Sequence, residues 1–228
     1  MLCAVALPSL AGRLQRAFDA LSVYDYFKAR SLFLKETKRN PAAAWYGLSV
    51  ITGRADNPFH QLDSCFAYIL RAEAAWALAK ERQRTAYVEL GAGLPAILAQ
   101  KERVHGLGWE RARNINTASG YQAYIDRFAD SPHVAEATVA RDELAFQEAH
   151  TLNTADAYRR FLDEHPGAMQ SGLAAAHMHE ALFREAVPNG TLAEYERFIA
   201  GHPESPLVAD AYRGIYRLSA PDGTPEQL

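Results

Sequence analysis

The sequence has few of the residues and motifs on which covalent chemistry or metal binding usually depends. It contains two cysteines in 228 residues, Cys3 and Cys65, and their spacing fits neither a disulfide framework nor a cysteine-based zinc site. No stretch reaches the roughly 18 apolar residues of a membrane-spanning helix. Nucleophile-elbow, phosphate-loop, dinucleotide-binding and zinc-protease motifs are missing as well. We therefore expect no catalytic residue, no metal site and no cofactor, and a protein that is not an enzyme.

Lysine is missing from the C-terminal half, and the two halves of the chain differ in charge. Residues 1–117 contain 16 Lys and Arg against 10 Asp and Glu, whereas residues 118–228 contain 8 Arg, no Lys and 17 acidic residues. The ordinary interpretation is two differently solvated surfaces. The alternatives are a basic face for an anionic partner, or self-association of the basic N-terminal half with the acidic C-terminal half. Because no basic cluster has interleaved aromatic residues, we do not expect nucleic acid as a partner.

A spacing of 37 residues organises the C-terminal half. An aromatic residue at Trp109, Phe146 and Phe183 is followed each time by alanine three residues later and by threonine eight residues later. Internal periods of this length are typical of repeated helix hairpins. Further matches in the same register are Tyr121, Tyr158 and Tyr195; Tyr124, Phe161 and Phe198; Ile125, Leu162 and Ile199; and Ala137, Ala174 and Ala211.

The first helix of each unit is predicted from its N-cap and its apolar stripe. Thr117, Thr154 and Thr191 stand where a hydroxyl can accept a free amide of the first turn, and Thr191 with Glu194 matches a capping box. Tyrosine, an aromatic residue three positions later and an aliphatic residue four positions later share one helical face. Each first helix is therefore expected to bury three large side chains.

The second helix of each unit is expected to begin at a Ser-Pro pair, with serine as the N-cap and proline at the first helical position. These pairs are Ser131-Pro132 and Ser205-Pro206. In the middle unit Gly167-Ala168-Met169 replaces the pair, which predicts a looser or shifted helix start. Phe146 and Phe183 near the end of these helices are expected to pack into the next hairpin.

The N-terminal half is helical but less regular. We expect Asn57-Pro58 to cap one helix over Phe59–Arg84, and Gly91-Ala92-Gly93 to interrupt the pattern. The helix resumes at Leu94–Val104, and Gly106-Leu107-Gly108 is expected to kink or end it before Trp109. The predicted apolar stripe of the first of these helices consists of Phe66, Ile69, Leu70, Ala74 and Leu78.

Both halves resemble tetratricopeptide (TPR) proteins. In the N-terminal half Ala29, Phe33 and Pro41 match the small, aromatic and terminating positions of that repeat, although Glu36 replaces a small residue. The C-terminal units are similar to the longer TPR-like repeats of bacterial cell-envelope proteins, such as the outer-membrane assembly lipoprotein and the peptidoglycan-synthesis coordinator. The residues that fit their pattern are Tyr195, Phe198, Ile199, Pro203, Ser205, Pro206 and Ala211. The resemblance covers residues 22–50 and 109–218.

The resemblance implies an all-α fold, a right-handed α-solenoid of stacked antiparallel helix hairpins. We divide the chain into a signal-peptide remnant at 1–12, an irregular TPR-like region at 13–108, three hairpin repeats at 109–220 and a frayed tail at 221–228. Residues Leu2–Leu10 are apolar, and Ser9-Leu10-Ala11 before Gly12 has the small-x-small form of a signal-peptidase site, but a positively charged start is missing. We expect export to the periplasm or envelope; the alternative is an apolar first helix in a cytoplasmic protein.

The resemblance also implies that the first helices line the concave side of the solenoid. Exposed positions beside the aromatic stripe differ between units, which fits either a tailored binding surface or an unconstrained one. Our candidate residues for partner binding are Gln122, Arg159, Arg160, Glu196 and Arg197. Arginine suits the recognition of carboxylates and polar peptides.

The remaining titratable residues are interpreted as structural. His165 and His202 occupy the position that Phe128 holds in the first unit, which indicates packing at a helix end. His177 and His179 point apart on a helix and cannot share a metal ion. The carboxylate pairs Asp142-Glu143 and Asp163-Glu164 are expected to be solvated.

We therefore expect a non-catalytic protein-interaction scaffold of a bacterial envelope complex, with a protein or peptide as its partner. Two alternatives remain open. One is the helical platform of a peptidoglycan-active envelope enzyme whose catalytic part lies outside this chain. The other is a solenoid that binds a glycan or a small ligand.

Overall fold

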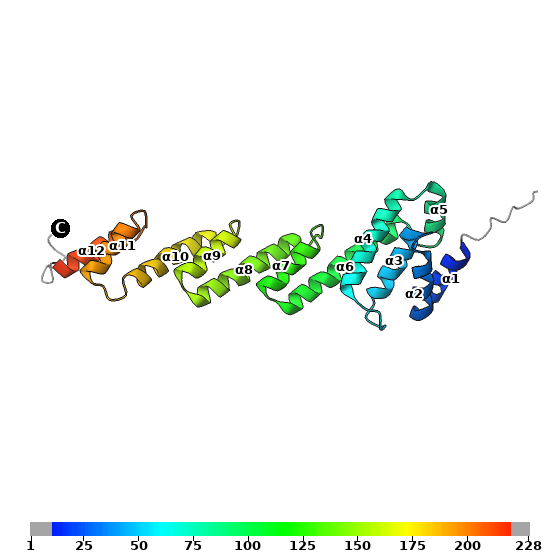
Figure 1. Ribbon diagram of the computed structural model, residues 1–228, viewed down its shortest axis with the longest axis horizontal. Coiled ribbons are helices and arrows are strands. Elements are labelled where there is room, and N and C mark those ends of the chain that lie inside the picture. The colour runs from blue at the N-terminus through cyan, green and yellow to red at the C-terminus, as the bar shows by residue number, and fades with distance from the viewer. Residues whose placement is uncertain (1–10, 220–228) are drawn as a thin grey trace, which may run out of the picture. The chain divides into compact units, whose positions relative to one another are not determined.

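The computed structural model describes residues 11–219, and all regular secondary structure in that range is helical. This confirms the all-α class. Most of the expected signal remnant (1–10) and the expected tail lie outside the described residues. The helices are α1 (Ala11–Ser22), α2 (Tyr26–Glu36), α3 (Pro41–Thr52), α4 (Leu62–Leu78), α5 (Glu81–Glu89), α6 (Leu94–Ile115), α7 (Ala118–Arg127), α8 (Val134–Leu152), α9 (Ala155–Glu164), α10 (Ser171–Ala186), α11 (Leu192–Gly201) and α12 (Val208–Ser219) (Figure 1).

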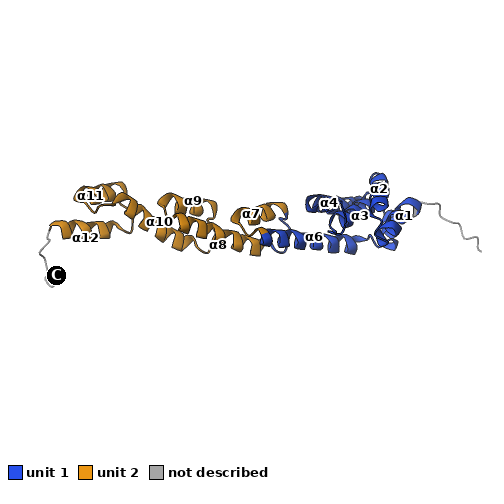
Figure 2. Cartoon of the chain, turned by 90° about the horizontal axis from the view of Figure 1, so that it is seen from below, with its two compact units in different colours: residues 1–114, 128–133 blue, residues 115–127, 134–228 orange. Residues whose placement is uncertain are grey.

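The chain divides into two compact units, which are coloured separately in Figure 2. Unit 1 comprises residues 1–114 and 128–133, and unit 2 comprises residues 115–127 and 134–228. The loop at 128–133 therefore packs with unit 1, although the helices on either side of it belong mainly to unit 2.

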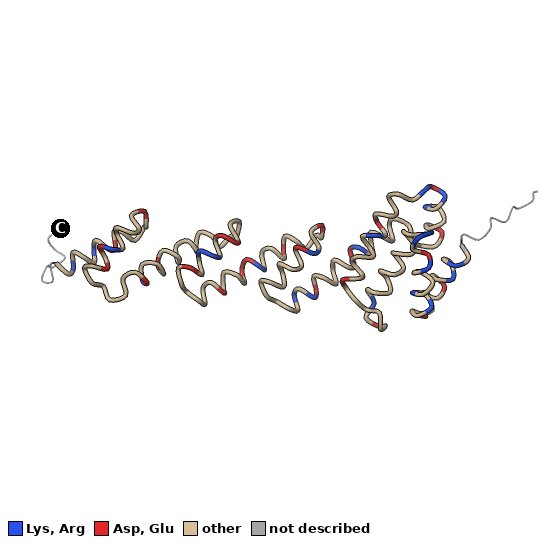
Figure 3. The backbone as a smooth tube through the Cα atoms, in the orientation of Figure 1, with Lys and Arg blue, Asp and Glu red and all other residues tan. Residues whose placement is uncertain are grey.

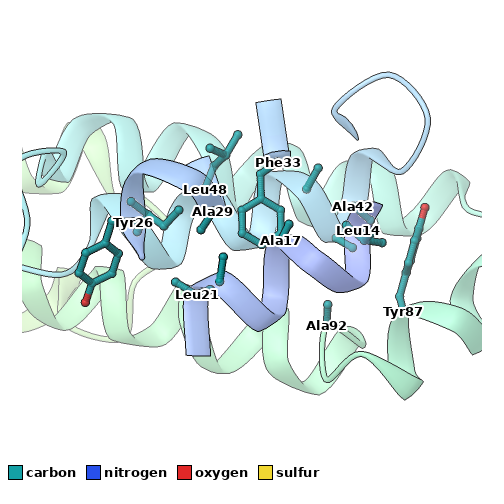
Figure 4. Close-up of a cluster of buried hydrophobic side chains, with 14 residues drawn as sticks. Leu14, Ala17, Leu21, Tyr26, Ala29, Phe33, Ala42, Leu48, Tyr87 and Ala92 are labelled. Carbon is teal, nitrogen blue, oxygen red and sulfur yellow. The ribbon is translucent and has the colours of Figure 1, made fainter. Parts of the chain in front are cut away.

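The core of unit 1 forms where aromatic rings meet small residues. Phe33 of α2 is fully buried, and Figure 4 shows it close to Ala17 and Ala29. Its ring packs edge-on against Phe18 of α1, with the ring centroids 4.9 Å apart. A Cβ atom at Gly47 of α3 would lie only 2.3 Å from Cζ of Phe33. Glycine at 47 therefore lets α3 approach α2 closely.

Glu36, which departs from the TPR pattern, belongs to a buried polar network. Its carboxylate accepts hydrogen bonds from Asn40 Nδ2 at 2.6 Å and from the Arg13 guanidinium at 3.1 Å. The Tyr87 hydroxyl donates to Asn40 Oδ1 at 3.4 Å. Burial raises the pKa of Tyr87, and the negative charge of Glu36 raises it further. A buried carboxylate is tolerated here because it is paired and hydrogen-bonded.

The single helix expected over Phe59–Arg84 is wrong, because α4 ends at Leu78 and α5 begins at Glu81. Ala79 and Lys80 adopt extended backbone angles between them, with ψ values of 138° and 153°. The break redirects the chain so that Tyr87 of α5 reaches the core, where it is 1% exposed. Burial of this ring outweighs the local preference for a continuous helix.

The apolar stripe expected on this helix is also partly wrong. Phe66 and Ile69 are buried as expected, but Leu78 is 87% exposed and Leu70 is also exposed. Cys65 and Ala72 are buried on α4 in addition.

Helix α6 runs through the Gly106-Leu107-Gly108 segment, so the expectation that the helix ends there is wrong. A Cβ atom at Gly108 would lie 2.6 Å from Cε2 of Phe128, whereas a Cβ atom at Gly106 would meet no atom within 4 Å. Glycine at 108 is needed for close packing of this ring.

Unit 2 contains three consecutive helix hairpins whose helices begin at regular positions. Helices α7, α9 and α11 begin at residues 118, 155 and 192, and α8, α10 and α12 begin at residues 134, 171 and 208. Successive starts in both sets are thus 37 residues apart. Figure 2 shows α7, α9 and α11 on one side of this unit and α8, α10 and α12 on the other.

The threonine N-caps are confirmed. The hydroxyl oxygens of Thr117, Thr154 and Thr191 accept hydrogen bonds from backbone amides three residues later. The Glu194 carboxylate in turn accepts from the backbone amide of Thr191 at 3.0 Å, which completes the capping box.

The residues that precede these threonines have positive φ angles. The angles are 48° at Asn116, 49° at Asn153 and 65° at Gly190. Asparagine and glycine are the residues that adopt this left-handed conformation most readily, which explains their position between successive helices.

The second helices begin later than expected. Ser131 and Ser205 are followed by a turn, in which each hydroxyl accepts a hydrogen bond from the amide two residues later, and the helix begins three residues after the serine. The shifted start expected for the middle hairpin is wrong, since Ser171 opens α10 in the same register. The turn in the middle hairpin is held by a backbone hydrogen bond from Ala168 to His165, which needs neither serine nor proline.

Gly108→Ala is expected to lower the free energy of unfolding by about 1–3 kcal/mol, because the Phe128 ring must move. Gly106→Ala, two residues earlier in the same helix, meets open space and should raise the free energy of unfolding by up to about 1 kcal/mol through its higher helix propensity. Urea denaturation of both variants measures the difference. Equal effects of the two substitutions would contradict the close packing at 108.

Candidate functional surface

The five residues predicted to bind a partner all lie on the first helices of the three hairpins in unit 2. Gln122 belongs to α7, Arg159 and Arg160 to α9, and Glu196 and Arg197 to α11 (Figure 1). Because the hairpins start 37 residues apart, Arg160 and Arg197 occupy equivalent positions on successive first helices.

Three of these residues are exposed and make no polar contact within residues 11–219. The side chains of Arg160, Glu196 and Arg197 form neither a hydrogen bond nor an ion pair in this part of the chain. Arg159 is also exposed and forms an ion pair with Asp156 on its own helix, with both side chains more than half exposed. Exposed pairs of this kind contribute little to stability, so Arg159 can exchange its partner at low cost.

The side chain of Gln122, unlike those of the other four residues, is hydrogen-bonded to residues of both helices of its hairpin. Its amide nitrogen donates to Asp126 Oδ1 at 2.7 Å, and its amide oxygen accepts from the Arg141 guanidinium at 2.6 Å. Both ends of the side chain are thus occupied by neighbours from α7 and α8. The structure therefore places Gln122 within a scaffold contact, whereas the three arginines have groups directed to solvent.

Asp142 is part of a buried network that the sequence did not reveal. It is 6% exposed, so the expectation of a solvated carboxylate is wrong at this position. Its Oδ1 atom accepts hydrogen bonds from the Arg141 guanidinium at 2.6 Å and lies 2.9 Å from Nδ1 of His165. Asp163 and Glu164 are exposed as expected. The network joins α8 to the loop after α9.

His165 and His202 pack at helix ends. They are the C-cap residues of α9 and α11, and their rings lie 5.3 Å from the centroids of Phe161 and Phe198 respectively. Phe128, the corresponding residue of the first hairpin, is buried, whereas the two histidines are half-buried. The predicted structural position of both histidines is confirmed.

No metal centre is formed by the residues that the structure describes, because no three His, Cys, Asp or Glu side chains are placed to hold an ion. His177 lies instead beside Glu180, with Nδ1 3.2 Å from the carboxylate. Over the same residues, none of the helices has the length and apolar character needed to cross a bilayer.

The strongest grouping of charges lies in unit 1. Lys101 Nζ is 2.8 Å from Glu73 Oε2 and 2.5 Å from Asp130 Oδ2, and His105 Nε2 is 3.3 Å from the second oxygen of Asp130. The hydrogen bond from Lys101 lowers the pKa of Asp130. Burial alone would lower the pKa of Lys101, but its hydrogen bonds to Asp130 and Glu73 outweigh burial and raise it.

The ring of His105 is buried between two phenylalanines. Its centroid lies 6.1 Å from that of Phe66 and 5.9 Å from that of Phe128. Burial lowers the pKa of His105, and the positive charges of Lys101 and His133 act in the same direction against the opposing effect of Asp130. The sequence could not reveal this cluster because its members come from α4, α6 and the loop at 128–133.

Comparisons of the chain with family models, with curated proteins and with solved structures give no match.

The stability of the protein is expected to fall on acidification partly through His105. The pKa of His105 is lower in the folded protein than in the unfolded chain. Below about pH 6.5 the unfolded chain therefore binds more protons at this residue, and the free energy of unfolding falls. Urea denaturation should therefore show a smaller loss of stability for His105→Gln than for the wild type between about pH 7.5 and about pH 5.5. The exposed His60, replaced by Gln, is the control and should leave the loss unchanged. Identical losses in all three proteins would contradict this account of His105.

Proposed function

We propose that the chain is a TPR-like α-solenoid that acts as a non-catalytic protein-interaction scaffold. In this proposal the three hairpins of unit 2 are repeats with a period of 37 residues, and the outward faces of α7, α9 and α11 hold a peptide or a partner domain. The compartment that we propose is the bacterial envelope, on the basis of the apolar N-terminus and the resemblance of the repeats.

One observation carries this proposal: contacts within the scaffold recur from hairpin to hairpin, whereas the exposed positions of the first helices differ. The threonine cap is present in all three hairpins. Beside it, one set of equivalent positions holds Gln122, which contacts the scaffold, and the exposed Arg159 and Glu196; the next positions are exposed in all three hairpins and hold alanine, Arg160 and Arg197. A constant framework with variable surface residues is the arrangement used by repeat proteins to bind different partners.

The chemistry of the exposed arginines favours an acidic or polar segment of a protein. Arginine presents a planar fork of donors that can bind a carboxylate through two hydrogen bonds at once. Arg160 and Arg197 have these donors available within the described part of the chain, and Arg159 is held only by an exposed ion pair. In Figure 3 the blue positions of α7–α12 are arginines, and they lie among the acidic residues drawn in red.

The test begins with affinity purification of the chain from its native cell and identification of the bound protein by mass spectrometry. Replacing Arg159, Arg160 and Arg197 together by Ala is expected to weaken recovery of that partner about tenfold or more. The melting temperature should stay the same, because exposed substitutions change stability by less than about 0.5 kcal/mol.

A matched control removes the same amount of charge elsewhere. Arg82, Arg103 and Arg111 are exposed residues of α5 and α6, and their joint replacement by Ala should leave partner recovery unchanged. Equal recovery with both triple variants would count against the surface of α9 and α11.

A further inference from the structure

A second exposed surface lies on unit 1, where the first turn of α2 meets the loop between α3 and α4. We call it the Tyr24 surface and define it by five residues. Two of them, Arg54 and Phe59, come from the loop. The other three, Tyr24, Phe27 and Arg30, come from the start of α2 and the residues just before it.

Tyr24 has a backbone conformation that is unfavourable for a bulky residue, with a φ angle of 62°. It follows α1, and two hydrogen bonds fix its position: its own amide donates to the carbonyl of Leu21 at 3.1 Å, and the amide of Asp25 donates to the carbonyl of Ala20 at 2.9 Å. This is the Schellman arrangement at the end of a helix, in which the left-handed residue is usually glycine.

Other positive-φ positions in the described chain carry the expected residues. They are Gly91, Asn116, Asn153 and Gly190. Tyrosine at position 24 is therefore an exception within this protein, and left-handed geometry at such a residue costs about 1–2 kcal/mol. A strained residue of this kind is an indication of function when burial does not explain it.

Burial does not explain Tyr24. Its side chain is 60% exposed, and two neighbouring apolar residues, Val23 and Phe27, are 70% and 68% exposed. Three large apolar side chains within five residues thus face solvent. Contiguous apolar groups of this kind on a soluble protein are typical of interaction sites.

The two arginines are held beside these rings in a fixed arrangement. The Arg54 guanidinium lies 4.9 Å from the centroid of Tyr24, and the Arg30 guanidinium lies 4.8 Å from the centroid of Phe59. Phe27 packs edge-on against Phe59, with the centroids 4.8 Å apart. Stacking on a ring leaves donors at the edge of the Arg30 guanidinium available to a ligand, whereas Nη1 of Arg54 donates to the Tyr26 hydroxyl at 3.3 Å.

The loop that carries Phe59 is also held in place. The side-chain amide of Asn57 donates to the carbonyls of Ile51 and Arg54 at 2.9 and 2.8 Å, and its oxygen accepts from the amide of Phe59 at 2.8 Å. The surface is therefore organised before any partner binds, which reduces the entropy lost on binding.

The two arginines of the Tyr24 surface differ in their electrostatic surroundings. The hydrogen bond from Tyr26 lowers the pKa of Asp56, and the positive charge of Arg54 lowers it further, so the charge of Arg54 is partly balanced by Asp56. Within residues 11–219 no carboxylate forms an ion pair with Arg30 or Arg54. Asp25 accepts from the amide of Lys28 at 3.1 Å, and Asp56 accepts at 2.7 Å from the Tyr26 hydroxyl, to which Arg54 also donates at 3.3 Å. Arg30 is therefore the arginine whose charge is available to a partner. Charge complementarity thus favours an anionic group on the partner.

We propose that the Tyr24 surface binds a segment of a partner protein that presents a bulky apolar side chain next to an Asp or Glu carboxylate. The apolar side chain packs against Tyr24 and Phe27, and the carboxylate is bound by Arg30. Tyrosine and arginine are the residues most often found at the energetic centre of protein interfaces. This site lies in unit 1 and does not depend on the function proposed for α7, α9 and α11.

The probe is a phage-displayed library of random peptides of about twelve residues, selected on the full chain. Enriched peptides are expected to combine Asp or Glu with Leu, Ile, Phe or Trp. Their dissociation constants are then measured by fluorescence anisotropy with synthetic peptides. A library that yields no binder, or only basic binders, overturns the proposal.

Tyr24→Gly separates binding from folding. Glycine relieves the strained φ angle, so the melting temperature should stay equal or rise, whereas loss of the ring should weaken peptide binding about tenfold or more. A purely structural role for Tyr24 predicts the opposite pattern, with a lower melting temperature and unchanged binding. The control is Tyr212→Ser at an exposed tyrosine of α12, which should not change binding.

Arg30→Glu tests the charge and should weaken binding about tenfold or more, while Arg82→Glu, at an exposed arginine of α5, should weaken it far less. Loss of binding with both variants would indicate general electrostatic attraction and overturn the proposal. The triple alanine variant of Arg159, Arg160 and Arg197 should bind these peptides normally, so the two proposals can be tested independently.

Sedimentation velocity of the protein alone tests for self-association. If the protein self-associates and Tyr24→Gly abolishes this, the Tyr24 surface binds a second copy of the chain, and the proposal is overturned.

Discussion

The structure of unit 2 depends on one constraint: a hairpin of two helices has more apolar surface than the two helices can bury against each other. The second helices α8 and α10 meet this constraint by being longer than the first helices, with 19 and 16 residues against 10. Their C-terminal halves carry Phe146 and Phe183 into the next hairpin. The ring centroids lie 5.6 Å from Phe161 and 4.9 Å from Phe198 respectively. The first two hairpins are thus each stabilised by the one that follows, and the proposed solenoid is the consequence.

Much of unit 2 could be predicted from the sequence because its signals are local and recur. A threonine cap and the aromatic stripe after it predict the start of each first helix. The 37-residue spacing also placed the partner-binding candidates Arg160 and Arg197 at equivalent positions, and both are exposed. The start of each second helix was placed less accurately, because Ser131 and Ser205 hold a turn before the helix. Ser-Pro pairs are compatible with both arrangements.

The features that were missed depend on residues far apart in the chain. The break between α4 and α5 has no glycine or proline to indicate it, and it forms because Tyr87 is buried against the first three helices. Asp142 could not be recognised as buried without the contact from His165. The Tyr24 surface was missed because neither a φ angle of 62° nor the stacking of Arg54 on the ring is encoded in a local pattern. Tertiary packing overrides local preference at each of these places.

Hydrogen exchange of Phe183→Ala tests the dependence of each hairpin on its neighbour most directly. Removing this ring leaves the contacts of Phe198 and Tyr195 with α10 incomplete. The account predicts that amides of α11 and α12 exchange about tenfold faster or more, whereas those of α7 keep the protection that they have in the wild type. Equal acceleration in all six helices of unit 2, or no acceleration in α11 and α12, would contradict it.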